Sequence, residues 1–238
     1  MKKILYGVQG TGNGHTTRAR MMAKAFQQVD VEVDYFFSGR PHDKYFDMDV
    51  FRGYRIEEGV TLSYDRGKVS PFKTYMQADL TRLFRDIRSL DLSSYDLILN
   101  DFEPITAWAG RSQKKPVIAM CHQASFMHQA VPKSGGHFMT RQMIKWFAPA
   151  DLYLGVHWYH FGGAIIPPFI EPYDATLPDQ NSILVYLPFE SLDDIVELLR
   201  CSVASKNADL FVTIRTRLTK KLIISSSEHH HVMHFSKH

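Results

Sequence analysis

A glycine-rich turn that ends on a histidine is the first feature of this sequence that could carry chemistry. An apolar run over 3–8 leads into the segment GVQGTGNGHTTRAR, and a helical pattern follows over 15–28. Glycines between a strand and a helix let the backbone approach a ligand closely. The helix dipole disfavours a charged imidazole at a helix N-terminus, so His15 should be mostly neutral. We therefore predict a general base at His15; the alternative is a histidine that only caps the helix or fills the turn.

Two familiar phosphate-binding loops do not fit this turn. A nucleoside triphosphate loop needs a lysine directly after its last glycine, and here no lysine occurs before Lys24. The dinucleotide fingerprint G-x-G-x-x-G needs a third glycine where this chain has His15. It also needs an acidic residue after the second strand, but the predicted strand 31–37 is followed by Ser38 and Gly39. An NAD-dependent oxidoreductase is therefore the weakest of the functions considered.

A second polar group follows a buried strand later in the chain. The segment YDLILNDFEPITAWAG predicts a strand over 96–100, then Asp101, then a helix over 103–113. In a doubly wound sheet this strand neighbours the first, which places Asp101 at the same carboxyl edge as His15. Its carboxylate could accept the imidazole N–H and fix the tautomer of the ring. The alternative is that Asp101 is only a helix N-cap.

The order of the predicted elements is that of a Rossmann-like, parallel α/β sheet. The clearest helix, over 71–90, has an apolar stripe at three- and four-residue steps, and Ser70 and Pro71 signal its start. The stretch 39–69 breaks the rhythm and predicts a short hairpin or a long loop. Further strands are expected at 116–121 and 151–156, and a further helix at 136–148.

A change in composition divides the chain into two domains. Residues 166–182, IPPFIEPYDATLPDQNS, carry four prolines and no periodicity, which predicts a linker. We expect a Rossmann-like domain over 1–165 and the start of a second one over 183–238. The second part begins with a strand at 183–187 and a helix capped by Ser191, but the last twenty residues show neither pattern. We therefore expect a truncated donor-side domain with a disordered tail.

Composition excludes several classes of function. The net charge of +3 on 238 residues is too small to indicate nucleic acid as a partner. The two cysteines give no disulfide framework and favour a reducing compartment. Neither a signal peptide nor a membrane-spanning run is expected, so we predict a cytoplasmic protein. The crowded histidines near the end do not predict a metal site, and no cofactor is expected; these histidines are His229, His230, His231 and His234.

Together, the two polar stretches resemble the GT-B glycosyltransferases, which use nucleotide-sugar donors. The first loop is similar to the G-G-T-G-G-H loop of the N-acetylglucosaminyltransferases that make lipid II. It is more similar to an uncharacterised microbial branch that begins with V-Q-G-x-G-x-G-H. LILNDFEPITAWAG is similar to the strand-D-x-F…W-A segment of UDP-glucosyl and glucuronosyltransferases. The match spans 1–195 and implies that His15 is the catalytic base and Asp101 its partner.

Residues on the acceptor side are expected around the first loop and the end of the strand 116–121. His122 and Gln123 either line the acceptor pocket or are loop residues. Arg18 either meets an anionic acceptor, such as a lipid diphosphate, or lies on a solvated helix face. The resemblance implies that the acceptor also approaches the loop at Gly10, Thr11, Gly12, Asn13 and Gly14.

The donor side is expected at the first turn of the second domain. The turn LPFES lacks the glycines with which some relatives hold the donor diphosphate. The acidic, glycine-bearing segment that grips uridine and sugar is expected beyond residue 238. We therefore expect this chain to bind a UDP-sugar weakly or not at all and to transfer no sugar. The donor-side residues expected in this turn are Pro188, Phe189, Glu190 and Ser191.

The resemblance implies an inverting, metal-independent glycosyltransferase. It would move a hexose or N-acetylhexosamine from a nucleotide-diphosphate sugar, UDP-linked, to a hydroxyl of a glycan or lipid-linked acceptor. A role in cell envelope glycan and peripheral contact with the inner face of the membrane are part of this expectation. The alternatives are a non-catalytic module that binds nucleotide sugar or acceptor and, after it, an NAD-dependent oxidoreductase.

Overall fold

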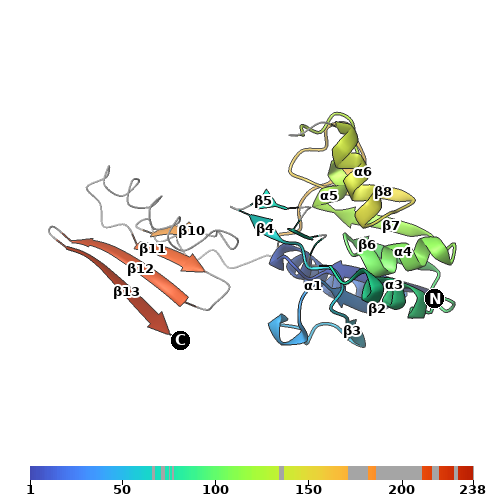
Figure 1. Cartoon of the computed structure of the whole chain (residues 1–238), viewed down its shortest axis with the longest axis horizontal. Coiled ribbons are helices and arrows are strands. Elements are labelled where there is room, and N and C mark those ends of the chain that lie inside the picture. Colours follow the sequence, from blue (N-terminus) through green and yellow to red (C-terminus); the bar gives the residue numbers. More distant parts are fainter. Residues whose placement is uncertain are drawn as a thin grey trace. The chain divides into compact units, whose positions relative to one another are not determined.

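The chain consists of two compact units in a computed structural model (Figure 1). The first contains Met1–Leu62 and Thr74–Glu171, and the second contains Ser63–Lys73 and Pro172–His238. The structure describes residues 1–65, 68–70, 73–74, 76, 78–133, 137–170, 182–185, 211–215, 220–227 and 230–237.

A seven-stranded parallel sheet is the centre of the first unit, with the strand order β3-β2-β1-β6-β7-β8-β9. The predicted α/β class is confirmed, and the five predicted strands of this unit match observed strands to within one residue at either end. The observed strands are β1 (Lys2–Gln9), β2 (Val31–Ser38), β3 (Tyr54–Ile56), β6 (Leu97–Asp101), β7 (Val117–Cys121), β8 (Leu152–Val156) and β9 (Ile165–Ile166).

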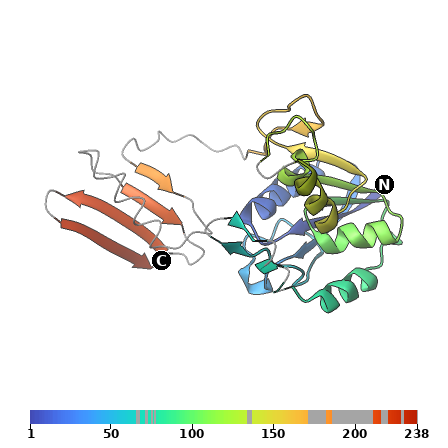
Figure 2. The same ribbon diagram turned by 45° about the horizontal axis from the view of Figure 1, so that its top comes forward.

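Helices cover both faces of this sheet (Figure 2). One helix packs against one face and three against the other, while α5 is a single turn directly after β7. Among the described residues, none of the helices combines the length and the apolarity needed to cross a bilayer. The helices are α1 (Asn13–Phe26), α3 (Leu80–Ser89), α4 (Pro104–Ser112), α5 (His122–Ser125) and α6 (His137–Phe147), with a 3-10 turn η1 (His42–Lys44).

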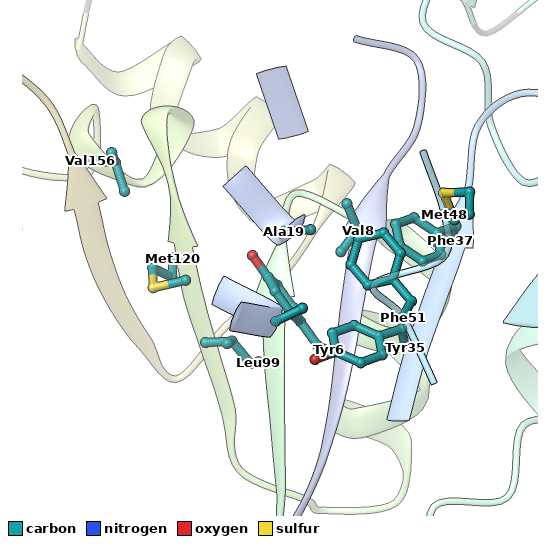
Figure 3. Packing of buried hydrophobic residues seen from close by; sticks show 11 residues of the cluster. Tyr6, Val8, Ala19, Tyr35, Phe37, Met48, Phe51, Leu99, Met120 and Val156 are labelled. Atoms are coloured by element: carbon teal, nitrogen blue, oxygen red, sulfur yellow. The ribbon is translucent and has the colours of Figure 1, made fainter. Parts of the chain in front are cut away.

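Alternating side chains of the strands form an apolar core on each face. Tyr6 and Phe37 lie in one cluster with Ala19 of α1 (Figure 3). Leu5 and Ile98 lie in a second cluster, on the other face, with residues of α3 and α4. Burial on both faces explains why the strands appear in the sequence as nearly continuous apolar runs. A third cluster joins α4 and α6 to β7 through Ala107, Ile144, Ala119 and Cys121.

The predicted helix over 71–90 is wrong at its start. α3 begins at Leu80, and the side chain of Asp79 accepts a hydrogen bond from Arg82 N at 2.9 Å as its N-cap. Residues 73, 74 and 76 are helical, but 78 and 79 are not. The apolar stripe of the sequence cannot show such an interruption, because an aspartate that bonds the backbone locally offers an alternative to the helix.

The stretch 39–69 contains a strand as well as a hairpin. β3 pairs in parallel with β2, with Tyr35 opposite Tyr54. A strand of three residues is too short to show a period of two, so the sequence did not reveal it. The predicted hairpin is confirmed by the antiparallel strands β4 (Tyr64–Asp65) and β5 (Lys68–Val69) of the second unit.

The second unit also contains a four-stranded sheet with the order β10-β11-β12-β13. Its first strand agrees with the strand predicted at 183–187, whereas the helix predicted after Ser191 lies outside the described residues. The prediction that the end of the chain lacks strands is wrong, because β12 and β13 pair antiparallel, with Ser227 opposite His230. Serine and histidine at many positions obscure the strand pattern there. The strands are β10 (Ser182–Val185), β11 (Phe211–Arg215), β12 (Lys220–Ser227) and β13 (His230–Lys237).

The close packing of α4 on β1 gives a test of the fold. A Cβ at Gly7 would overlap the side chain of Thr106, so we expect Gly7→Ala to lower the free energy of unfolding by about 1–3 kcal/mol. Gly14→Ala is the matched control: no atom lies within 4 Å of a Cβ there, and alanine favours the helix. Denaturant unfolding measures both variants. Equal stabilities of the two variants would contradict this packing.

Candidate active site

The ends of β1 and β6 bring the two predicted polar groups together. The strands are parallel neighbours with Val8 opposite Asp101, so both lead to the same edge of the sheet. His15 lies in the first turn of α1, whose N-cap is Gly12. His15 Nδ1 is 2.7 Å from Asp101 Oδ1. The hydrogen bond that we predicted between these side chains is therefore confirmed.

Arg18, one turn further along α1, binds the same carboxylate. Its Nε donates to Asp101 Oδ2 at 2.7 Å, and its Nη2 donates to Oδ1 at 2.7 Å. Residues three apart share a helix face, so α1 presents His15 and Arg18 to Asp101 side by side. Asp101 is fully buried, and the side chains of His15 and Arg18 are 12% and 13% exposed.

This ion pair corrects one of the two interpretations of Arg18 made from the sequence. The side chain is 13% exposed and bound to Asp101, so it does not lie on a solvated helix face. A contact with an anionic acceptor stays a prediction, because the guanidinium has further N–H groups. Sequence reasoning missed this role, although the spacing of three residues from His15 was a signal for it. Arg18 therefore holds the carboxylate in place and compensates its charge.

Charge compensation keeps Asp101 ionised in its buried position. Burial alone would raise the pKa of this carboxyl, but the charges of Arg18 and His15 and their hydrogen bonds outweigh burial. The pKa therefore lies below its ordinary value of 3.8. Burial would lower the pKa of Arg18, but the attraction of Asp101 raises it. At neutral pH the pair consists of a carboxylate and a guanidinium.

The hydrogen bond to Asp101 decides which nitrogen of His15 carries the proton. An ionised carboxylate only accepts, so Nδ1 must donate to it. In the neutral ring, Nε2 then holds the lone pair. Arg18 Nη2 lies 3.2 Å from His15 Nδ1, but two N–H groups cannot bond each other, so this is only a contact. His15 is therefore oriented as a base at Nε2, with Asp101 behind it.

The glycines of the first loop serve two purposes. Gly10 is packed inside, because a Cβ there would overlap the hydroxyl of Tyr45. Gly12 and Gly14 face open space: a Cβ at Gly12 would meet only His15 Cδ2, at 3.6 Å, and one at Gly14 would meet nothing within 4 Å. The loop is therefore open beside the His15 ring, where a substrate can approach.

Thr11 and Asn13, both expected on the acceptor side, have partners within the protein. Thr11 is 2% exposed, and its hydroxyl donates to Gly39 O at 3.2 Å. Asn13 Oδ1 accepts from Arg40 Nη1 at 2.9 Å. Thr11 thus faces inward and supports the loop rather than a ligand, because the end of β2 lies directly beside it.

The N-cap of α4 is Glu103 and not Asp101. The side chain of Glu103 accepts from Ile105 N at 2.9 Å and from Thr106 N at 2.6 Å. Phe102, between the two carboxylates, has a φ of 58°, a left-handed conformation that is unusual for a bulky residue. This turn lets Asp101 face α1 while Glu103 faces α4. The alternative of a capping Asp101 is therefore wrong.

Glu103 also explains why the end of β2 is unsuited to a dinucleotide. Ser38 Oγ donates to Glu103 Oε1 at 2.6 Å, and both side chains are fully buried. Burial raises the pKa of Glu103, although its hydrogen bonds act against this. This carboxylate is enclosed between β2 and α4, so it cannot bind the ribose hydroxyls as the dinucleotide fingerprint requires.

Two stacked histidines lie at the ends of β7 and β8. His122 Nδ1 is 3.3 Å from Val156 O and must donate to that carbonyl, which leaves the lone pair on Nε2. Its ring stacks on His157, with the centroids 5.7 Å apart and the planes at 17°. His157 Nδ1 accepts from Tyr159 N at 3.1 Å, so its neutral ring carries the proton on Nε2. The pair thus offers one acceptor and one donor.

The surroundings of His122 connect this pair to the edge of the sheet that holds His15. Partial burial lowers the pKa of His122, and the nearby groups His157, Arg18 and His15 lower it further. Gln123 has a buried Oε1 that accepts no hydrogen bond from the described residues. His157 was not predicted, because a single histidine after a strand carries no pattern that separates it from a loop residue.

The four residues expected on the donor side lie outside the described residues: Pro188, Phe189, Glu190 and Ser191. Within the described ranges, no three side chains of His, Cys, Asp or Glu gather closely enough to hold a metal ion.

Comparisons with known proteins agree on one kind of protein. The family model described as "Glycosyl transferase family 1" matches residues 2–219. A sequence search of curated proteins finds no match. Similar solved structures include SsfS6 from Streptomyces sp. SF2575 with thymidine diphosphate, at a TM-score of 0.51 and 10% identity, over 90% of this chain and 68% of that one.

Two further solved structures extend the comparison. The spinosyn rhamnosyltransferase SpnG has a TM-score of 0.51 and 9% identity, over 90% of this chain and 66% of that one. MurG of Acinetobacter baumannii has a TM-score of 0.48 and 12% identity, over 90% of this chain and 61% of that one. The chain thus spans 61–68% of these three proteins. At such identities, SsfS6 and SpnG show a shared fold.

The tautomers give a direct test of the site. We expect nitrogen NMR of the labelled protein at mildly alkaline pH to show a protonated Nδ1 in His15 and His122. His157 serves as an internal comparison, because its proton is expected on Nε2. In Asp101→Asn the amide can donate or accept, so His15 should lose its single tautomer. A wild-type His15 protonated on Nε2 would show that Asp101 does not orient the ring.

The lowered pKa of Asp101 predicts an acid-dependent contribution to stability. A group with a lowered folded pKa stabilises above its unfolded pKa, here near 3.8, and loses this contribution as the pH falls through the folded value. At neutral pH, Asp101→Asn leaves Arg18 uncompensated and should cost about 3–5 kcal/mol. The stability gap to wild type, measured by denaturant unfolding, should narrow below pH 3.8. A gap that does not change with pH would contradict the ion pair.

Proposed function

The chain belongs to glycosyl transferase family 1, and from this membership we propose that it transfers a hexose or N-acetylhexosamine to a hydroxyl acceptor. The donor in this proposal is a nucleotide-diphosphate sugar. The observation that carries the proposal is the His15 ring, whose Nδ1 is held by a buried carboxylate at 2.7 Å. The position beside Gly12 adjoins that ring, since a Cβ there would lie 3.6 Å from His15 Cδ2.

The proposed reaction is a single displacement. Nε2 of His15 takes the proton of the acceptor hydroxyl while its oxygen forms a bond to the anomeric carbon of the sugar. The bond from that carbon to the diphosphate oxygen breaks, and its electron pair leaves with the nucleoside diphosphate. Attack opposite to the leaving group inverts the anomeric configuration. Asp101, held by Arg18, stabilises the imidazolium that forms.

The stacked histidines support a proposed site for the acceptor. A hydroxyl of the acceptor would donate to Nε2 of His122, and a second would accept from the Nε2 proton of His157. An acceptor with neighbouring hydroxyls, such as a glycan or a lipid-linked sugar, fits this pair of groups. In this proposal His122 and His157 select the acceptor, and His15 acts on it.

The donor and the location belong to the same proposal. SsfS6, which shares the fold, was solved with thymidine diphosphate, which supports testing thymidine-linked sugars beside the UDP-sugars expected from the sequence. We also include metal independence: transfer should persist in excess EDTA, and its restoration only by added Mg²⁺ would contradict this. A cytoplasmic location and a role in cell envelope glycan remain proposals.

Replacement of the base tests the proposed reaction. We expect His15→Ala to lower the rate of sugar transfer at least about a hundredfold, the usual contribution of a positioned base. His42→Ala, at an exposed histidine of η1, is the matched control and should leave the rate unchanged. The assay measures product from UDP- and thymidine-linked sugars with glycan and lipid-linked acceptors. Equal rates for wild type and His15→Ala would refute His15 as the base.

The alternative functions give different results in binding experiments. Calorimetric binding of UDP or a UDP-sugar without any transfer would support a non-catalytic binding module. Weak or absent binding together with no transfer would support the inactivity expected from the sequence. Saturable binding of NADH that is lost on Gly12→Val would support an oxidoreductase. Turnover of about one per second or more would exclude an inactive chain.

A further inference from the structure

The turn between β8 and β9 consists almost entirely of side chains that carry rings. Residues 157–161 read HWYHF, five rings in succession, and Gly162 and Gly163 follow them. Trp158 and Tyr159 are 76% and 59% exposed, although side chains of this size ordinarily lose much of their contact with water on folding. Single exposed apolar residues are ordinary, whereas neighbouring aromatic side chains on one exposed turn indicate a binding surface.

Hydrogen bonds within this turn fix its shape. His157 Nδ1 accepts a hydrogen bond from Tyr159 N at 3.1 Å. In the same way, His160 Nδ1 accepts one from Gly162 N at 2.9 Å. Phe161 has a φ of 48° and Gly162 one of 71°, and a bulky residue keeps a left-handed conformation only where its surroundings hold it. The exposed rings therefore lie on a backbone that is ordered before a ligand binds, which lowers the entropic cost of binding.

A series of ring contacts joins this turn to the proposed acceptor site. The ring centroid of Phe161 lies 5.2 Å from that of His157 and 4.9 Å from that of Tyr159. His157 stacks on His122, and the ring of His122 meets that of Phe126 edge-on, with the centroids 5.1 Å apart. The exposed rings are thus continuous with the two histidines to which we assign the hydroxyls of the acceptor.

The turn and its two strands lack the four residue types that are charged at neutral pH. Residues 152–170 contain no aspartate, glutamate, lysine or arginine. Arg18, at the same edge of the sheet, is compensated by Asp101. Lys133 follows the segment that packs against the turn at Gly163, and its ammonium donates to two backbone carbonyls at 2.7 and 2.8 Å. A ligand at the turn meets rings and imidazole nitrogens but no counter-ion, which favours an uncharged ligand.

We propose that residues 157–163, which we call the aromatic turn, bind a sugar ring of a neutral oligosaccharide acceptor. The C–H groups on one face of a pyranose pack on aromatic rings, whereas its hydroxyls lie at the ring edge and need hydrogen bonds. Trp158 and Tyr159 supply the apolar contact, and Nε2 of His122 and the Nε2 proton of His157 meet hydroxyls of the adjoining sugar. This inference rests on the proposed function and deepens it, because it names the acceptor as a chain of uncharged sugars.

The order of the strands sets the length of such an acceptor. His15 follows β1 and the aromatic turn follows β8, with β6 and β7 between these two strands. Neighbouring strands lie about 4.8 Å apart, so the base and the aromatic turn are separated by about 14 Å along the carboxyl edge. One pyranose ring is much shorter than this distance. An acceptor that reaches both places must therefore consist of linked sugars, with the reacting hydroxyl at the end near His15.

Calorimetry of the full chain with defined sugars tests the proposal and needs neither a donor nor turnover. The neutral probes are maltotetraose, cellotetraose and N-acetylated chitotetraose, and the comparisons are glucose and the charged tetragalacturonate. We expect at least one neutral tetrasaccharide to bind at least about tenfold more tightly than glucose and tetragalacturonate. The double variant Trp158→Ala/Tyr159→Ala should bind that tetrasaccharide at least about tenfold more weakly, because aromatic anchors carry much of the free energy of a contact.

Two single variants separate the aromatic turn from other exposed rings. Trp158→Phe keeps an aromatic face at the same position and should retain most of the affinity. Trp146→Ala is the matched control: it removes a tryptophan of α6 that is 72% exposed, and it should bind the tetrasaccharide like wild type. Because Trp158 and Tyr159 are exposed, their replacement leaves the core of the sheet unchanged, and denaturant unfolding of the double variant checks this.

The proposed site and the proposed reaction fail in different ways. No binding of any neutral tetrasaccharide, equal affinities of wild type and the double variant, or equal binding of tetragalacturonate would each overturn the aromatic turn as a sugar site. An equal loss in Trp146→Ala, or a dimer in sedimentation that Trp158→Ala dissolves, would also overturn it. A wild type that binds the tetrasaccharide through this turn but transfers no sugar would refute the reaction and leave the sugar site in place.

Discussion

The buried carboxylate of Asp101 is the constraint on which the site depends. An ionised carboxylate removed from water without partners costs several kcal/mol, by order of magnitude. Asp101 is fully buried, and it is stable there because Arg18 binds it bidentately and His15 donates to it. Both partners come from the first turns of α1. The pairing of β1 with β6 is therefore more than a core contact, since it brings charge and compensation to one place.

Two carboxylates separated by one residue have opposite environments. Asp101 faces a guanidinium and an imidazole, which hold its pKa down, whereas Glu103 meets only neutral donors, and burial raises its pKa. The left-handed Phe102 separates them; such a conformation costs about 1–3 kcal/mol and persists where the surroundings compensate it. Phe102 stacks on Phe147 of α6, with the centroids 4.6 Å apart. Packing thus holds the turn that directs both carboxylates.

Different surfaces of the same sheet carry different groups of side chains. Its carboxyl edge holds His15 and the stacked histidines, while α4 and α6 cover one face with basic and apolar side chains. The two regions are joined through Phe102, which belongs to the edge and packs in the core cluster with Ile144 of α6.

The sequence by itself determined the strands of the parallel sheet and the meeting of His15 with Asp101. Local periodicity marks buried strands, and parallel order sends their ends to one edge. Only the tertiary structure decided that Arg18 binds Asp101, that Glu103 caps α4, and that His122 stacks on His157. These outcomes depend on one backbone angle at residue 102 and on which side chains lie nearest across many residues of separation. The three-residue spacing of Arg18 from His15 indicates only that the two share a helix face, and it does not identify the carboxylate that they bind.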